Sequence, residues 1–181
     1  MLITPTNSAL LVIDIQEKLL PALHNAEQLM TNSQWLIEVA ADLSIPTLVT
    51  EQYPKGLGHT STQLKPFLSS ATILEKEHFS AAEEAHILKS VNDLEKEQLV
   101  LIGAESHVCL LQTAIGFSEQ GYDVYVVTDA IASRKESDYN AALLRMQQNG
   151  IQLVSKEMVA FEWLHKCNTD KFREISKGYL R

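Results

Sequence analysis

The chain has 181 residues, of which 45% are hydrophobic and 21% charged, the balance of an ordinary soluble globular protein. Its net charge of −8 argues against binding to the phosphate backbone of a nucleic acid. Two cysteines are too few for a disulfide framework. No apolar run approaches the roughly 18 residues that span a bilayer, so we expect no membrane association.

The beginning of the chain has no basic stretch of the kind that opens a secretory leader. Free thiols persist in a reducing compartment. We therefore expect a cytoplasmic protein, and its length predicts a single domain over residues 1–181.

The first predicted element is a strand at residues 9–15, a run of apolar side chains that only Asp14 interrupts. Strands that are buried on both faces of a parallel sheet have this composition. A charge is seldom buried without a partner. Asp14 is therefore either a cap that binds backbone amides at the strand end or a functional group.

A helix at residues 27–43 and a short strand at residues 45–50 follow. Residues 52–63 contain a proline and two glycines and are predicted to form a loop. Lys76 follows a weak strand at residues 72–74. It stands between two glutamates, a pattern that by itself is typical of a solvated charge cluster.

The second half of the chain continues the alternation, with helix 81–90, strand 98–103, helix 108–120, strand 123–128, helix 136–148, strand 151–154 and a helix from about residue 157. Gly121 is expected at the C′ position of the helix at residues 108–120. The tail from residue 168 is expected to be irregular or helical.

Strands that alternate with helices of this length form βαβ crossovers and hence a parallel sheet. The predicted fold class is α/β: a Rossmann-like, three-layer α/β/α sandwich with a six-stranded parallel sheet in the order 3-2-1-4-5-6. Open sheets of this kind bind ligands beyond the carboxyl ends of the strands, where the strand order reverses. That point lies between the first and the fourth strand.

Three chemically active side chains fall on this edge of the sheet. Asp14 ends the first strand, Lys76 follows the third, and Cys109 begins the helix after the fourth. A helix N-terminus and a nearby cation both lower the pKa of a thiol, so the arrangement favours a reactive Cys109. The competing interpretation is an inert packing residue, as many free cysteines are.

Three segments carry a resemblance to a known family: Leu11-Val12-Ile13-Asp14-Ile15-Gln16, Lys76-Glu77-His78-Phe79-Ser80 and Gly103-Ala104-Glu105-Ser106-His107-Val108-Cys109. They resemble the isochorismatase-like cysteine hydrolases, in the right order and spacing over about residues 8 to 160. Residues 50–58 are most similar to the branch that holds isochorismatase domain-containing protein 2.

The resemblance implies a catalytic triad of Asp14, Lys76 and Cys109. It also implies a cis peptide between Ala104 and Glu105, with an oxyanion hole formed by the N–H groups of Glu105 and Cys109. Asp14 would accept the thiol proton while Lys76 holds Asp14 and stabilises the thiolate. The thiolate would cleave a C–N bond of a small amide or carbamoyl compound through a thioester. Relatives commonly form dimers or larger assemblies, so we expect a homo-oligomer.

Four further side chains are candidates for the substrate pocket: Gln16, Tyr53, Phe79 and His107. Nicotinamidases of the same family bind a metal through an Asp-x-His after the second strand, where this chain has Glu51-Gln52-Tyr53. His59 alone cannot hold a metal that needs three or four ligands. We therefore expect neither a metal nor another cofactor.

Two other functions stay open. A vinyl ether hydrolase of the isochorismatase type would use Asp14 and Lys76 without a nucleophile. A non-catalytic protein-interaction domain would have an unreactive Cys109. Cys167 has no acid or base pattern beside it and is interpreted as a surface or packing thiol.

Overall fold

A computed structural model describes residues 1–179. Its six strands are β1 (Ser8–Ile13), β2 (Thr47–Gln52), β3 (Thr72–Lys76), β4 (Gln98–Gly103), β5 (Asp123–Ile131) and β6 (Gln152–Val154). They form a single sheet in the order β3-β2-β1-β4-β5-β6, and every neighbouring pair is parallel. The predicted fold class, strand number and strand order are thus confirmed.

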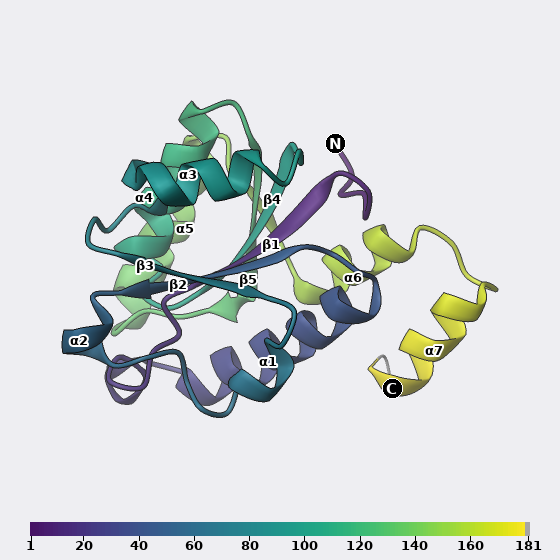
Figure 1. The fold of residues 1–181 in the computed structure, drawn as a ribbon, viewed down its shortest axis with the longest axis horizontal. Coiled ribbons are helices and arrows are strands. Elements are labelled where there is room, and N and C mark those ends of the chain that lie inside the picture. The colour runs from purple at the N-terminus through teal and green to yellow at the C-terminus, as the bar shows by residue number, and fades with distance from the viewer. Residues whose placement is uncertain (180–181) are drawn as a thin grey trace.

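Helices cover both faces of the sheet (Figure 1). The α-helices are α1 (Ala26–Asp42), α2 (Pro54–Leu57), α3 (Ala85–Asn92), α4 (Cys109–Glu119), α5 (Glu136–Gln148), α6 (Lys156–Leu164) and α7 (Asp170–Gly178). Helices α1 and α6 lie on one face, and α3, α4 and α5 lie on the other (Figure 1). None of the helices in the described residues combines the length and the apolar character that crossing a bilayer requires.

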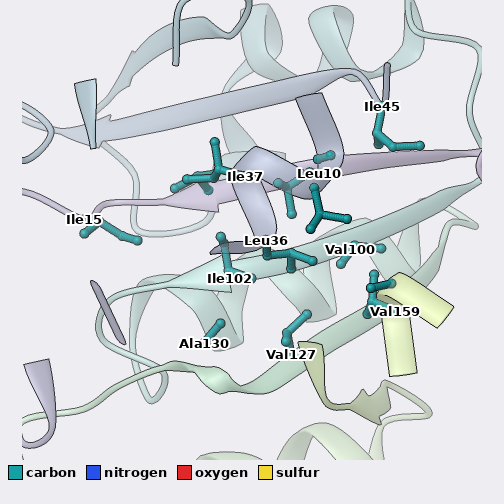
Figure 2. Close-up of a cluster of buried hydrophobic side chains, with 14 of the residues drawn as sticks. Leu10, Ile15, Leu36, Ile37, Ile45, Val100, Ile102, Val127, Ala130 and Val159 are labelled. Atoms are coloured by element: carbon teal, nitrogen blue, oxygen red, sulfur yellow. The ribbon is translucent and has the colours of Figure 1, made fainter. Parts of the chain in front are cut away.

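The core follows from the two-residue period of the strands. In β1, Leu10 and Val12 point into the cluster beneath α1 and α6, whereas Leu11 and Ile13 point into the cluster beneath α3, α4 and α5. Figure 2 shows the first cluster, in which Leu36 of α1 approaches the side chains of the central strands. Burial on both faces explains why β1 and β4 carry no polar side chain after their first residues, Ser8 and Gln98.

Several boundaries differ from those predicted. Strand β2 continues to Gln52, so the loop that was predicted to begin at residue 52 begins one residue later and contains the short helix α2. The predicted helix at residues 81–90 is a 3₁₀ turn (Ala81–Glu83) followed by α3. The tail after residue 168 forms α7, which packs on α1 through the Trp35 Nε1–Tyr179 O hydrogen bond of 2.8 Å. The last two residues of the expected domain, 180 and 181, lie outside the described part of the chain.

Gly103 lets β4 approach β1 at the point where the strand order reverses. Its φ angle is 146°, and a Cβ atom at this position would lie 2.1 Å from the Ile13 carbonyl oxygen. The next residue, Ala104, donates its N–H to that same oxygen at 2.8 Å. A residue without a side chain is therefore required here for the two strand ends to meet.

Candidate active site

Asp14 is the first residue after β1, and its φ angle of 51° is left-handed. Its side chain is fully buried. Oδ1 accepts a hydrogen bond from Thr50 Oγ1 at 2.7 Å, and Oδ2 lies 2.8 Å from Lys76 Nζ. The partners of the carboxylate are therefore a hydroxyl and an ammonium, not the backbone amides expected of a strand-end cap.

Lys76 ends β3, and its side chain is as deeply buried as that of Asp14. Besides Asp14 Oδ2, three acceptors surround its Nζ: Gln52 Oε1 at 2.6 Å, the Phe79 carbonyl at 3.0 Å and the His78 carbonyl at 3.2 Å. Four acceptors around three N–H groups hold the charged ammonium in place.

The interpretation of Lys76 as part of a solvated charge cluster is wrong. Glu75 and Glu77 are exposed, but the alternation of the strand turns the side chain between them inward.

Cys109 is the first residue of α4 and is only 2% exposed. Burial is the main cause that raises the pKa of its thiol, to about 12, and the Asp14 carboxylate adds to this effect. The Lys76 ammonium acts in the opposite sense but does not outweigh them. The expectation of a lowered thiol pKa is therefore wrong, because desolvation disfavours the thiolate more than the nearby cation favours it. At rest the thiol is therefore neutral.

The structure adds two residues to this group that the sequence did not single out. Thr50 donates to Asp14, as described above, and Gln52 Oε1 lies 4.0 Å from Cys109 Sγ as well as next to Lys76. Both stand at the carboxyl end of β2, the strand between β1 and β3. Their position at the carboxyl end of a strand could have identified both as site residues. Gln52 was not identified because the sequence predicts a loop from residue 52, at the start of a segment with a proline and two glycines.

The chain turns toward Cys109 at Glu105, whose φ angle is 52°. Every peptide bond in the described residues is trans, so the cis bond expected between Ala104 and Glu105 is absent. A cis bond without proline is about 3 kcal/mol less stable than the trans form, and here the left-handed Glu105 makes the turn instead. The Glu105 carboxylate pairs with Arg134 Nε at 2.8 Å.

The four candidate pocket residues lie in different environments. Gln16 is fully buried, and its amide bonds to the backbone of Gln52 and to the Gly58 carbonyl, so it tethers two loops. Tyr53 and Phe79 are about half exposed near the carboxyl ends of β2 and β3. His107 is partly buried and lies 3.0 Å from Ser133 Oγ through Nδ1.

A hollow of about 280 Å³ lies beyond the carboxyl ends of β2 and β3 and is lined by Tyr53, Lys76 and His78, among others. Phe79 does not line this hollow. Asp14 and Cys109 do not line it either, and the Lys76 side chain is inaccessible to solvent, so the hollow lies outside the buried group of Asp14, Lys76 and Cys109.

The described residues contain no group of three or more His, Cys, Asp or Glu side chains arranged to hold a metal ion. Glu51 and His59 pair with one another at 2.8 Å, and Glu51 also accepts from the Thr60 N–H at 2.7 Å. Burial opposes the charge of Glu51, but the bonds from Thr60 and His59 outweigh it and lower its pKa. These side chains fix the loop after β2.

The sequence also matches a known family. The family model of the isochorismatase domain matches residues 8–158. The chain belongs to the isochorismatase family. Isochorismatase domain-containing protein 2 of Danio rerio is 34% identical over 175 residues, which cover 94% of this chain and 85% of the relative. The predicted family and branch are thus confirmed.

Solved structures of isochorismatase-like proteins share the fold. MAR1 ribonuclease from Caenorhabditis elegans has a TM-score of 0.93 at 39% identity, over 100% of this chain and 93% of the other. YcaC from Escherichia coli, an octameric hydrolase of unknown specificity, has a TM-score of 0.92 at 25% identity, over 99% of this chain and 91% of the other. YcaC from Pseudomonas aeruginosa, solved with hexane-2,5-diol and covalent acrylamide, has a TM-score of 0.91 at 26% identity, over 99% of this chain and 92% of the other. The chain has the fold of isochorismatase-family hydrolases.

Proposed function

We propose that this isochorismatase-family protein is a metal-independent cysteine hydrolase that cleaves a C–N bond of a small amide or carbamoyl compound. The observation that carries the proposal is the fully buried ion pair of Asp14 and Lys76 next to the only buried thiol among the described residues, Cys109. A buried ion pair contributes little to stability, because desolvation offsets its attraction. A buried pair next to a thiol is therefore better explained by proton transfer with that thiol.

The first half-reaction begins from the neutral thiol. Asp14 takes the Cys109 proton as the sulfur attacks the carbonyl carbon, so that the S–C bond forms while the carbonyl π electrons move to oxygen. The N–H groups of Glu105 and Cys109 are the proposed donors to this oxyanion, and neither donates to another described residue. Such a donor contributes roughly 3 kcal/mol. The C–N bond then breaks, and Asp14 returns the proton to the leaving nitrogen.

The second half-reaction releases the acid. Water attacks the thioester carbon and gives a proton to Asp14, the S–C bond breaks, and the sulfur takes that proton back. Lys76 keeps its own protons throughout, since four acceptors hold its ammonium. Its role is to hold Asp14 and to offset the negative charge that passes between carboxylate and sulfur.

One structural neighbour supports this assignment. Acrylamide is an amide with an electrophilic alkene, and the YcaC structure from Pseudomonas aeruginosa contains it in covalent form. The net charge of −8 favours a small substrate over a polyanion, although the C. elegans neighbour is named a ribonuclease. The octameric state of YcaC from E. coli supports a homo-oligomer here. We place the activity in a reducing cytoplasm, where both free cysteines stay reduced.

The test is a screen of small amides and carbamoyl compounds for ammonia release, followed by the variants Cys109→Ala and Cys167→Ala. We expect Cys109→Ala to lower hydrolysis at least about 1,000-fold, as loss of a nucleophile does. Cys167 is exposed and outside the site, so its variant should keep full activity. Undiminished hydrolysis by Cys109→Ala would refute the thioester mechanism.

The same variants separate the alternatives. A vinyl ether hydrolase keeps its activity in Cys109→Ala and loses it in Asp14→Asn. A protein-interaction domain hydrolyses none of the compounds in the screen, in the wild type or in any of these variants.

A further inference from the structure

The side-chain amide of Gln52 has an orientation fixed by its partners. Its Nε2 donates to the Glu77 carbonyl at 2.7 Å, and its Oε1 accepts from Lys76 Nζ at 2.6 Å. A flipped amide would point an N–H group at an ammonium and an oxygen at a carbonyl, so the flip is excluded. The carbonyl oxygen of Gln52 therefore faces both Lys76 and, at 4.0 Å, Cys109 Sγ.

The backbone of Gln52 is also fixed, by the fully buried side chain of Gln16. Gln16 Oε1 accepts from the Gln52 N–H at 2.7 Å, and Gln16 Nε2 donates to the Gln52 carbonyl at 3.0 Å. Both polar groups of the Gln52 backbone are thus bonded to one amide. This clamp sets the depth at which the Gln52 side chain reaches the thiol.

We infer that Gln52 is a positioning residue that keeps the resting Cys109 thiol protonated and the Lys76 ammonium directed toward Asp14. The inference rests on the proposed function, since it assigns a role within the same site. An S–H group that donates to Gln52 Oε1 is stabilised in its neutral form. The Lys76 proton that bonds to Gln52 Oε1 is also unavailable to the sulfur.

The surroundings of the thiol agree with this role. Burial and the Asp14 carboxylate already raise the pKa of Cys109 to about 12. Gln52 acts in the same direction, so the sulfur loses its proton only when a bound substrate allows the transfer to Asp14. A neutral resting thiol also reacts slowly with adventitious electrophiles.

The experiment measures alkylation of Cys109 by iodoacetamide between pH 7 and 10, by peptide mass spectrometry. Exposed Cys167 serves as the reference thiol in the same molecule. Gln52→Met removes the acceptor and frees a Lys76 proton for the sulfur. We expect alkylation at pH 8 to become about tenfold faster, the effect of a fall in thiol pKa by about one unit. Gln52→Glu places a second negative charge beside the sulfur, and we expect about tenfold slower alkylation.

Gln98→Met is the matched control. Gln98 is also buried, and its amide accepts from the Thr4 N–H at 2.8 Å and donates to the Leu2 carbonyl at 3.0 Å. It begins β4, at the opposite edge of the sheet from Cys109. A general loosening of the fold would accelerate alkylation in all three variants, whereas the inferred role changes only the Gln52 variants, and in opposite directions.

Equal rates for Gln52→Met and the wild type, or a change of the same sign in both Gln52 variants, would overturn the inference. Hydrolysis by Cys109→Ala tests the proposed function separately. If that variant is inactive but the Gln52 variants alkylate like the wild type, the hydrolase proposal stands without the role of Gln52. If Cys109→Ala is active while the Gln52 variants behave as expected, Gln52 controls the thiol but the thioester mechanism is refuted.

Discussion

Replacement of Lys76 by Met tests how strongly the buried ion pair with Asp14 contributes to stability. Both side chains are inaccessible to solvent, and the distance between Lys76 Nζ and Asp14 Oδ2 is 2.8 Å. In Lys76→Met the carboxylate keeps only the Thr50 hydroxyl as a charge-stabilising donor. Removal of one partner from a buried pair lowers the free energy of unfolding by about 3 to 5 kcal/mol. That is a large part of the 5 to 15 kcal/mol typical of a domain.

The assay is urea denaturation at pH 7, followed by the fluorescence of buried Trp163. In the double variant Asp14→Asn with Lys76→Met no charge is left unpaired, so we expect most of the loss to be recovered. Lys89→Met breaks an exposed pair with Asp93 and should cost at most about 0.5 kcal/mol. A loss below about 1 kcal/mol in Lys76→Met, or no recovery in the double variant, would refute the reasoning.

Two further predictions concern stability. The pKa of Cys109 is about 12 in the folded protein, above the ordinary value of a thiol in the unfolded chain, so folding favours the protonated form. The contribution of this thiol to the free energy of unfolding should therefore be constant below about pH 8.5 and fall by up to 1.4 kcal/mol per pH unit above it. The urea midpoint of Cys109→Ala should lack this fall with pH. Gly103→Ala forces a Cβ to within 2.1 Å of the Ile13 carbonyl oxygen, and we expect it to lower the free energy of unfolding by at least about 3 kcal/mol. Gly121→Ala, where φ is 94° but the space is open, should cost only about 1 kcal/mol; equal losses in the two variants would contradict the steric argument.

The sheet could be predicted because its signal is local. The central strands β1 and β4 carry no polar side chain after their first residues, Ser8 and Gln98, and this pattern is typical of a strand covered on both faces. Strand β2 was harder, because it continues through Glu51 and Gln52. Polar side chains at a strand end look like a loop until the neighbouring strands show that they are buried.

The candidate site was predictable in part for the same reason. The carboxyl ends of parallel strands meet at one edge, so the sequence positions of Asp14, Lys76 and Cys109 place them together. The protonation state of the thiol was not predictable, since it depends on burial depth, which no short segment encodes. The role of Gln52 was not predictable either, because its contacts are with Lys76, 24 positions away, and with Cys109, 57 positions away.

Three residues with left-handed backbone surround the site, each within two positions of a strand end: Asp14 (φ 51°), Tyr53 (φ 38°) and Glu105 (φ 52°). Each such residue other than glycine carries roughly 1 to 2 kcal/mol of strain, which the surrounding contacts must balance. A designer who transplants the acid, the lysine and the thiol onto another Rossmann-like scaffold would therefore obtain three side chains that miss one another. The bends must be transplanted with them, together with the Gln16 amide that fixes the backbone of Gln52 beside Tyr53.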